Sequence, residues 1–343
     1  MNSVADVSPS AMLDALESDD LVGATERLCA PLSRGASIAD VIDAVIAPVL
    51  VEIGRRWHRR DWTVGREHRA TATIDAALAA IELRYPAPVT NRRGPLLLAC
   101  AENEWHSLPA RLAAVRLRAH GHDVVFLGPS LAPHHIGAHL GRIEAAAFGL
   151  SCTLSANLIG ARRCVEAAHA VGVPVVVGGA AFDNAEPRAR SIGADATWGF
   201  DDVDAFLCAP RMRATAVPRG SQRSSLRMRR EAIDLDVCLD GVVAAAMVEI
   251  ALRYPPLAGL DRPAAARMEA RLARLLQSIA VAIDQDEPDL FNEFLIWAQL
   301  GLEARAMPDV LLLALDSIQH VLPPTFPRAT VLVRRAAAVR RGR

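Results

Sequence analysis

The sequence contains no lysine, because all 38 of its strongly basic residues are arginine. It therefore has no P-loop lysine, no Schiff-base lysine and no lysine of the kind that kinases use to bind ATP. The six cysteines show no paired spacing, so we expect reduced thiols and neither a zinc nor a disulfide framework. The N-terminus lacks the features of a signal peptide, and no apolar stretch is long enough to cross a bilayer. We expect a soluble, cytoplasmic protein without membrane contact.

The chain does contain ample apolar material. Its 343 residues are 52% hydrophobic, which is enough for a core in each of two or three domains. The formal net charge is −1, so no general attraction to nucleic acid is expected. The fold class predicted from the patterns along the chain is α/β plus all-α. The expected segments are a four-helix bundle at 1–90, a flavodoxin-like (Rossmann-like) domain at 91–209, an arginine-rich linker at 210–230 and a helical domain at 231–343.

Four helices are predicted between residues 8 and 85. The third carries an apolar stripe that ends at Trp57, and the fourth places Glu67 at the head of another apolar stripe. A carboxylate at the end of a buried face needs a polar partner, so Glu67 and its neighbour His68 suggest a ligand contact. A glutamate that complements a helix start is an equally good explanation on these residues alone. Trp57 taken alone is better explained as core.

Strands and helices then alternate, which predicts a parallel sheet covered by helices. If the strand order is the flavodoxin-like 2-1-3-4-5, the first, third and fourth strands are neighbours and their carboxyl ends share one crevice. Open parallel sheets bind ligands at such an edge. The strands are expected at 96–101, 123–127, 145–150, 173–177 and 194–198.

A histidine with a nearby carboxylate follows the first of these strands. Glu104 lies two residues before His106 and can reach back to one ring nitrogen. Such a contact fixes the tautomer and makes the other nitrogen a better metal ligand. A histidine in such a loop is more often an ordinary surface or core residue, so the pair alone is a weak signal.

Small and hydroxyl-bearing residues follow the two neighbouring strands. Ser151 and Thr153 offer hydroxyls for hydrogen bonding, and the absent side chains of Gly178 and Gly179 would let a flat ligand approach the backbone. Each stretch also has a structural explanation, because Ser and Thr cap helices and glycine pairs end strands. All of them on one rim, together with His106, predict a ligand crevice.

These stretches resemble a known family. Glu104-x-His106-x-x-Pro109, then Ser151-x-Thr153, then a glycine pair is similar to the cobalamin-binding module, whose usual form is Asp-x-His-x-x-Gly, Ser-x-Leu, Gly-Gly. The resemblance implies that the dimethylbenzimidazole tail of cobalamin lies along the sheet and that His106 binds the cobalt from below. Two positions depart from the usual form. Glu104 replaces Asp and lengthens the supporting contact by one methylene, and Pro109 replaces Gly.

The helical segment resembles a narrower family. Trp57, nine residues, then Glu67-His68 is similar to the motif of cobalamin-dependent photoreceptors, in which a four-helix bundle covers the upper face of adenosylcobalamin. The resemblance implies that Trp57 and Glu67 contact the adenosyl group in the dark, with His68 supporting them. His58 matches the histidine that binds cobalt after light breaks the cobalt–carbon bond. The likeness covers residues 8–208.

The segment 210–230 carries seven arginines and no acidic residue. It could touch nucleic acid, but an arginine-rich linker in a lysine-free protein is the plainer explanation. Residues 231–343 return to helical patterns and predict five helices in a domain of globin-like size.

The domain order resembles the photocobilins, in which a further domain holds the linear tetrapyrrole biliverdin near the cobalamin. Under that resemblance Trp297, Arg305 and His320 are candidates for an aromatic wall, a propionate partner and a pyrrole contact. Cys238 is a candidate for a thioether bond to a bilin. A structural role is the plainer explanation for each of these residues, and for Cys238 it is a buried position in a helix.

Three functions are compatible with the sequence. The first is a light sensor that binds adenosylcobalamin, with biliverdin as a second chromophore, and signals by a change in quaternary structure. The second is a corrinoid protein that carries methyl groups between methyltransferases. The third is a cobalamin-binding regulator that does not use light and sequesters a partner. The tryptophan-bearing cap favours the first over the second, because a methyl carrier must open its upper face.

No pattern indicates an enzyme. The segment from Gly149 to Thr153 lacks the second glycine of a nucleophile elbow. His135 and His139 lie one helical turn apart and are expected to face solvent rather than bind metal. We expect a homo-oligomer whose state depends on light, and a downstream protein partner that the sequence does not identify.

Overall fold

The computed structural model describes residues 8–90, 94–182, 186–197, 206, 222–254, 259–303 and 309–341. The chain forms two compact units, each built from several segments. Unit 1 consists of residues 1–153, 163–184 and 194–215, and unit 2 of residues 154–162, 185–193 and 216–343. Unit 1 joins the predicted bundle to the predicted sheet in one body. Among the described helices, none is long and apolar enough to span a bilayer.

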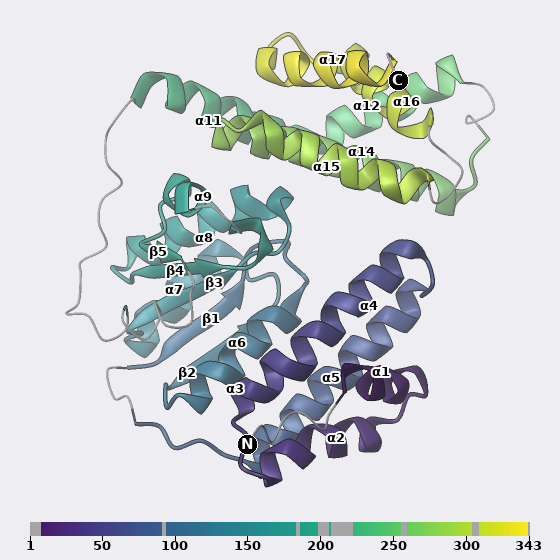
Figure 1. Cartoon of the computed structure of the whole chain (residues 1–343). Helices are drawn as coiled ribbons and strands as arrows, with labels where there is room; N and C mark the ends of the chain where they lie inside the picture. Colours follow the sequence, from purple (N-terminus) through teal and green to yellow (C-terminus); the bar gives the residue numbers. More distant parts are fainter. Residues whose placement is uncertain are drawn as a thin grey trace. The chain divides into compact units, whose positions relative to one another are not determined.

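The first part of unit 1 is the predicted helical bundle (Figure 1). Its third helix runs without a break through a π-turn that ends just before Pro48. Proline has no amide hydrogen and crowds the carbonyl four residues before it, and the wider π-turn relieves this crowding. The elements are α1 (Pro9–Glu17), α2 (Leu21–Ser33), α3 (Ile38–Val41), the π-turn η1 (Ile42–Ile46), α4 (Ala47–Arg59) and α5 (Val64–Arg84).

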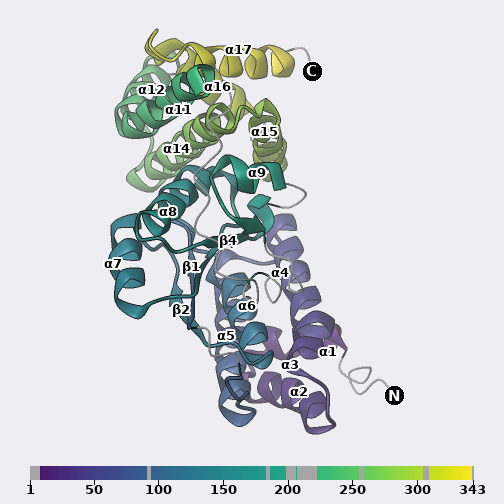
Figure 2. The ribbon, with the colours of Figure 1, turned by 90° about the vertical axis from the view of Figure 1, so that its left-hand side faces the viewer.

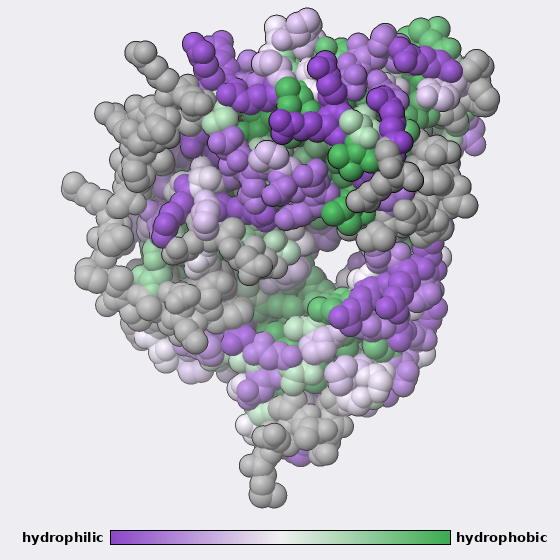
Figure 3. All heavy atoms as spheres, turned by 45° about the horizontal axis from the view of Figure 1, so that its top comes forward, coloured by the Kyte–Doolittle hydropathy of each residue, from purple (hydrophilic) through white to green (hydrophobic). Residues whose placement is uncertain are grey.

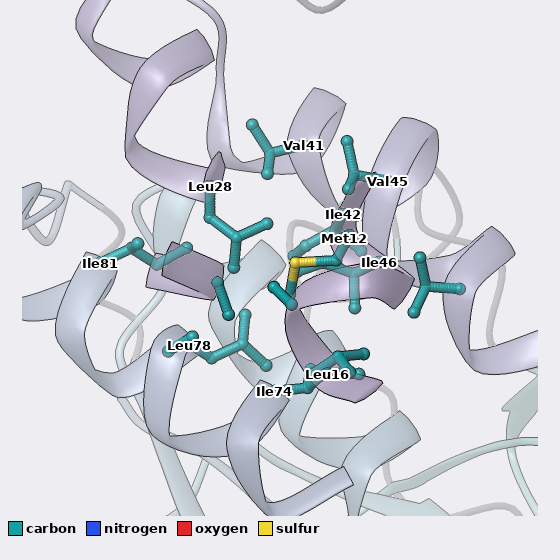
Figure 4. Packing of buried hydrophobic residues seen from close by; sticks show 14 of the residues in the cluster. Met12, Leu16, Leu28, Val41, Ile42, Val45, Ile46, Ile74, Leu78 and Ile81 are labelled. Carbon is teal, nitrogen blue, oxygen red and sulfur yellow. The ribbon is translucent and has the colours of Figure 1, made fainter. Parts of the chain in front are cut away.

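Branched aliphatic side chains from all the bundle helices meet in one core (Figure 4). Full burial of each such side chain contributes about 1.5–3 kcal/mol. Helix α6 (Ser107–Ala119) of the sheet domain adds Leu112 and Val115 to the same core, so the bundle and the sheet domain are packed together. The labelled core residues are Met12, Leu16, Leu28, Val41, Ile42, Val45, Ile46, Ile74, Leu78 and Ile81.

The second part of unit 1 is a five-stranded parallel sheet with the order β2-β1-β3-β4-β5, which confirms the predicted strand order. Every residue of β1 and β3 is buried, as expected for strands with helices on both faces. The register aligns Ser151 with both Cys100 and Gly178, so the three strands end level. The strands are β1 (Leu96–Cys100), β2 (Val124–Gly128), β3 (Ala147–Ser151), β4 (Val175–Gly178) and β5 (Ala196–Thr197).

Helices cover both faces of this sheet. Helix α6 lies between the sheet and the bundle in both ribbon views (Figures 1 and 2). On the opposite face α7 packs closely against α8, because a Cβ on Gly137 would lie 3.4 Å from the Ala167 carbonyl oxygen. The remaining elements are α7 (Pro133–Ile143), the 3₁₀ turn η2 (Ser155–Asn157), α8 (Leu158–Ala170), the 3₁₀ turn η3 (Ala180–Phe182) and α9 (Glu186–Ser191).

Ion pairs fix the bundle to α6. Arg111 contacts both Asp75, at 3.4 Å, and Glu82, and Arg118 contacts Glu82 at 2.8 Å. Because Arg111 reaches the earlier acid and Arg118 only the later one, α5 and α6 run in the same direction.

Among the residues described after 221, unit 2 has the five helices expected after residue 231, together with an earlier helix, α11. Helix α11 begins at Gln222, so residues 222–230 of the predicted linker are helical and that prediction was too long. These residues lack proline and glycine, and arginine and leucine are good helix formers. The helices are α11 (Gln222–Val237), α12 (Leu239–Arg253), α14 (Arg262–Gln285), α15 (Pro288–Glu303), α16 (Asp309–Val321) and α17 (Pro327–Arg341).

Unit 2 contains a buried ion pair and a buried carboxylate. Arg162 and Asp284 form an ion pair with both side chains buried, and burial raises the pKa of the Asp284 carboxyl against the opposing effect of the guanidinium. The Glu231 carboxylate accepts hydrogen bonds from the Arg328 and Ala329 amides at the start of α17, a position that favours negative charge. Hydrophilic side chains cover much of the helical surface seen in Figure 3. The globin-like character of this part stays a prediction.

Candidate functional site

The candidate site is built around the carboxylate of Glu104, which is fully buried just after β1. One oxygen accepts the backbone N–H of His106 at 3.0 Å and lies 2.6 Å from Nδ1 of the same residue. The other oxygen accepts the backbone N–H of Thr153 at 2.8 Å. A buried carboxylate is stable only when hydrogen-bonded, and these charge-assisted bonds are among the stronger ones. Glu104 therefore ties the loop after β1 to the loop after β3.

The backbone around Glu104 ties in a third loop. The Glu104 carbonyl accepts the N–H of Ser130, and the Ser130 hydroxyl accepts the N–H of Asn103. Asn103 and Ser130 both have positive φ, at 65° and 50°, a conformation that asparagine tolerates better than most residues. The loops after β1, β2 and β3 are thus joined at the carboxyl edge of the sheet.

His106 stands at the start of α6 with its side chain 54% exposed. Because Glu104 holds Nδ1 as a hydrogen-bond donor, Nε2 is the ring nitrogen suited to bind a metal. A buried carboxylate behind an accessible imidazole is the arrangement predicted from the sequence. Among the residues that the structure describes, there is no group of three or more His, Cys, Asp or Glu side chains that could hold a metal ion.

The loops after β3 and β4 carry the other predicted residues. Ser151 is buried, and its carbonyl accepts the N–H of Ala101. The Thr153 hydroxyl oxygen is buried and has no hydrogen-bond partner within the described structure. A buried orphan hydroxyl is unfavourable unless a ligand or water meets it. The Thr153 hydroxyl is therefore a polar group at this rim that is left for a ligand or a water to meet.

The structure gives Gly179 a reason to be glycine that the sequence did not show. Gly179 has a φ of +104°, and a Cβ on it would lie 2.4 Å from the Cys152 carbonyl oxygen. The missing side chain thus makes room for the chain's own backbone. Gly178 ends β4, and its carbonyl accepts the N–H of Cys152. Both glycines lock the loop after β3 in place.

The cysteines next to the site are inert. Burial, with a smaller contribution from the Glu104 charge, raises the pKa of the Cys100 thiol to about 12. Burial also raises the pKa of Cys152 well above its ordinary value. A thiol that stays protonated is neither a nucleophile nor a metal ligand. Neither residue competes with His106.

The predicted bundle residues flank one short loop. Trp57 and His58 end α4, and Glu67 and His68 lie in the first turns of α5. Trp57 is 36% exposed, which fits a ligand contact better than the core position expected for it in isolation. Glu67 is partly buried, and its carboxylate lies 3.4 Å from Nε2 of the exposed His68.

This loop lies at the same end of unit 1 as His106. Asp75 of α5 is level with Arg111 of α6, and the two helices run in the same direction. At 1.5 Å per residue, Glu67 lies about 12 Å before Asp75 and His106 about 7 Å before Arg111 along the same direction. The structure therefore brings the bundle candidates and the sheet candidates to one end of unit 1.

Sequence reasoning missed two tryptophans at this end. Trp62 is buried in the α4–α5 loop, with the guanidinium groups of Arg56 and Arg66 5.4 and 5.0 Å from its ring centroid. It fixes the loop that carries the bundle candidates. Trp105, between Glu104 and His106, is 71% exposed. Its place between Glu104 and His106 in the sequence is the signal by which Trp105 could have been found.

Of the C-terminal candidates, the structure describes the side chains of His320 and Cys238. The side chain of Trp297 and the whole of Arg305 lie outside the described residues. His320 is exposed at the end of α16, 3.0 Å from an Arg253 nitrogen and 3.7 Å from a Glu249 oxygen. Cys238 is exposed between α11 and α12. In unit 1, His135 and His139 are exposed, as expected.

Comparisons with known proteins match the same regions. Residues 94–207 match the family model described as B12 binding domain, and residues 11–82 match a second model described as B12 binding domain. The HTH-type transcriptional repressor CarH of Myxococcus xanthus is 30% identical over 169 residues, which cover 47% of this chain and 54% of CarH. The chain thus spans about half the length of this curated relative. These matches support a cobalamin-binding protein.

Two solved structures are also similar. The monomethylamine corrinoid protein of Methanosarcina barkeri aligns with a TM-score of 0.48 and 18% identity, covering 57% of this chain and 94% of that one. A cobalamin-binding protein of Desulfitobacterium hafniense aligns with a TM-score of 0.33 and 18% identity, covering 59% of this chain and 100% of that one.

The contact between Gly179 and Cys152 can be tested by comparing two glycines. Gly172→Ala places a side chain at positive φ in open space and should cost about 1 kcal/mol of unfolding free energy. Gly179→Ala adds the clash with the Cys152 carbonyl and should cost about 1–3 kcal/mol more. Urea unfolding of both variants measures the difference. Equal losses would show that the loop after β3 is not locked by Gly179.

Proposed function

We propose that this chain is a light sensor that binds adenosylcobalamin, with the His106 imidazole as the lower ligand of the cobalt. The observation that carries the proposal is the buried Glu104 carboxylate 2.6 Å from Nδ1 of the accessible His106. The proposal assigns the chain no catalytic activity. Its output is a change in its own conformation or assembly, read by a downstream partner.

The residues at the rim fit this cofactor. Glu104 holds one ring nitrogen of His106, and the unpartnered Thr153 hydroxyl offers a hydrogen bond where a ligand would lie against the loop after β3. A corrin is large and mostly apolar, and Trp57, Val64 and Trp105 present exposed apolar surface at this end of unit 1. Exposed apolar groups that gather beside convergent polar groups are typical of a ligand site.

The bundle residues have roles on the upper face. When bound, adenosylcobalamin supplies absorption of visible light and a cobalt–carbon bond that light can break. Trp57 and Glu67 would contact the adenosyl group and exclude water from it. His58, at the end of α4, is the imidazole placed to meet the upper face once that group has left. The contacts of the Arg56 and Arg66 guanidinium groups with the Trp62 ring would keep this loop ordered.

The junction between bundle and sheet domain would transmit the signal. Helix α6 starts at His106 and carries Arg111, Arg116 and Arg118, which pair with Asp75, Asp43 and Glu82 of the bundle. A change at the site can therefore alter a packed interface that has discrete ion pairs, the usual way in which a local event becomes a larger movement.

Illumination tests the proposal directly. Full-length protein reconstituted in the dark with adenosylcobalamin should change its absorption spectrum irreversibly under green light. His58→Ala should alter the spectrum after illumination but not the dark spectrum, and His135→Ala, which changes an exposed histidine elsewhere, should alter neither. A spectrum that light does not change would favour the regulator that does not use light. A cofactor bound only in methylated form would favour the methyl carrier.

The role of Glu104 can be measured separately from light. Glu104→Gln replaces one of the two acceptor oxygens by an NH2 group, which donates and cannot accept, so the side chain can no longer accept from both His106 and Thr153. Loss of such a supporting group lowers metal affinity roughly 10- to 100-fold. We expect weaker binding of adenosylcobalamin in the dark by this factor, measured by equilibrium dialysis, and no change for the exposed control Glu166→Gln. If a folded Glu104→Gln protein bound adenosylcobalamin with unaltered affinity, the assignment of His106 as the cobalt ligand would be contradicted.

We extend the proposal to biliverdin in unit 2, on the resemblance of the domain order to the photocobilins. Purified protein mixed with biliverdin should develop a red-absorbing band that survives gel filtration. His320→Ala should weaken the band if this residue contacts a pyrrole, and the exposed control His139→Ala should not. If no protein-bound band develops, the biliverdin part of the proposal is contradicted, and cobalamin remains the proposed chromophore.

A further inference from the structure

The junction between the bundle and the sheet domain contains a cavity of about 260 Å³, which we call the junction pocket. It lies where α5 and α6 end, whereas His106 stands at the start of α6. At 1.5 Å per residue, Arg118 in the wall of the pocket lies about 18 Å along α6 from His106. The pocket is therefore separate from the candidate cobalamin site. Its lining includes Ile38, Glu82, Tyr85, Val115, Arg118 and Ala119.

The junction pocket has the size and the apolar wall for a small organic molecule. Drug-sized ligands occupy pockets of roughly 300–1,000 Å³, so this pocket suits a somewhat smaller molecule. Ile38 and Val115 in its wall belong to the buried core of the bundle, and Tyr85 and Ala119 pack against that core. Water gains no hydrogen bonds from such a wall, whereas a hydrocarbon group gains free energy when it is buried there.

Arg118 provides hydrogen-bond donors in this pocket. Its Nε and Nη2 donate to the Val124 carbonyl at 3.1 and 2.9 Å, and its Nη1 donates to Glu82 at 2.8 Å. A guanidinium has five N–H donors, and within the part of the chain that the structure describes these bonds use three of them. One N–H on each terminal nitrogen is left. Because the existing bonds hold the guanidinium in place, the remaining donors are preorganised for a planar acceptor such as a carboxylate.

The charges at the junction favour an anion. Arg111 and Arg118 both pair with the single carboxylate of Glu82, and these three side chains are only 17%, 32% and 20% exposed. The other acids nearby, Asp75 and Asp123, are exposed, and the contact of Asp75 with Arg111 is long, at 3.4 Å. Solvent screens exposed charges more strongly than partly buried ones. The partly buried groups of the junction therefore carry a surplus of one positive charge.

We propose that the junction pocket binds a small organic carboxylate with an apolar body, such as a short fatty acid. The carboxylate accepts from the two remaining N–H groups of Arg118, and the hydrocarbon part lies on the apolar wall beside Val115 and Ala119. Such a ligand supplies the missing negative charge and also buries apolar surface, and neither water nor a neutral molecule does both. This site goes beyond the proposed light sensing and does not involve cobalamin.

Calorimetric titration of the full-length protein without cobalamin tests the charged part of the site. Hexanoate is the probe, and 1-hexanol is the uncharged probe of equal chain length. Hexanoate should bind with a Kd of roughly 1 mM or lower, and hexanol at least roughly tenfold more weakly, because it lacks the charge that Arg118 meets. Arg118→Gln should weaken hexanoate binding at least roughly tenfold. Arg142→Gln, on an exposed arginine of α7, is the matched control and should leave it unchanged.

A second pair of variants tests the apolar part without a change of charge. Ala119→Leu places a larger side chain in the pocket and should weaken hexanoate binding at least roughly tenfold. Ala79→Leu, on an exposed alanine of α5, should not. Circular dichroism checks that every variant is folded.

Three results would overturn the proposal. The first is no hexanoate binding at roughly ten times the expected Kd. The second is hexanol binding as tight as that of hexanoate. The third is wild-type affinity in a folded Arg118→Gln or Ala119→Leu protein. All of these measurements are made without cobalamin, so their failure would leave the proposed light sensing untouched.

Discussion

The structure of unit 1 depends on one buried negative charge. Transfer of the Glu104 carboxylate from water into the protein is costly, and the cost is offset only if the donors around it are fixed in place. Two of those donors are backbone amides, at His106 and Thr153, on loops that follow different strands. Satisfying the charge therefore fixes the loops, and the fixed loops in turn orient the imidazole. The orientation of the His106 imidazole therefore follows from a requirement of folding.

The sheet could be predicted from the sequence because its signals, apolar runs that alternate with helical patterns, are local and repeat along the chain. Parallel strands that are buried on both faces read as continuous apolar runs, as Leu96 to Cys100 does, and the alternation with helices limits the strand order to a few choices. The same reasoning placed His106 and Thr153 on one rim. It did not find Ser130 or Asn103, because both act through backbone groups and positive φ, and neither leaves a chemical signature in the side chain.

Two sequence interpretations were incomplete for physical reasons. Gly179 was expected to make room for a ligand, but the atom that needs the room is the Cys152 carbonyl, a contact between segments that no periodicity reveals. The arginine-rich segment was expected to be a linker as far as residue 230. A high density of arginine does not exclude a helix, because an arginine-rich stretch can be helical once one of its faces packs against another element. Here α11 packs against α14.

The two sides of the candidate site are held by different kinds of contact. The floor is tied by Glu104 to two loops and by the Gly179 contact to a third. The cap consists of the end of one helix and the start of another, and the ion pairs that fix it to α6 begin at Asp75, about 12 Å further along α5 than Glu67. A change at Trp57 or Glu67 would therefore act on a part of the bundle that lies beyond these ion pairs and is held by the bundle's own core.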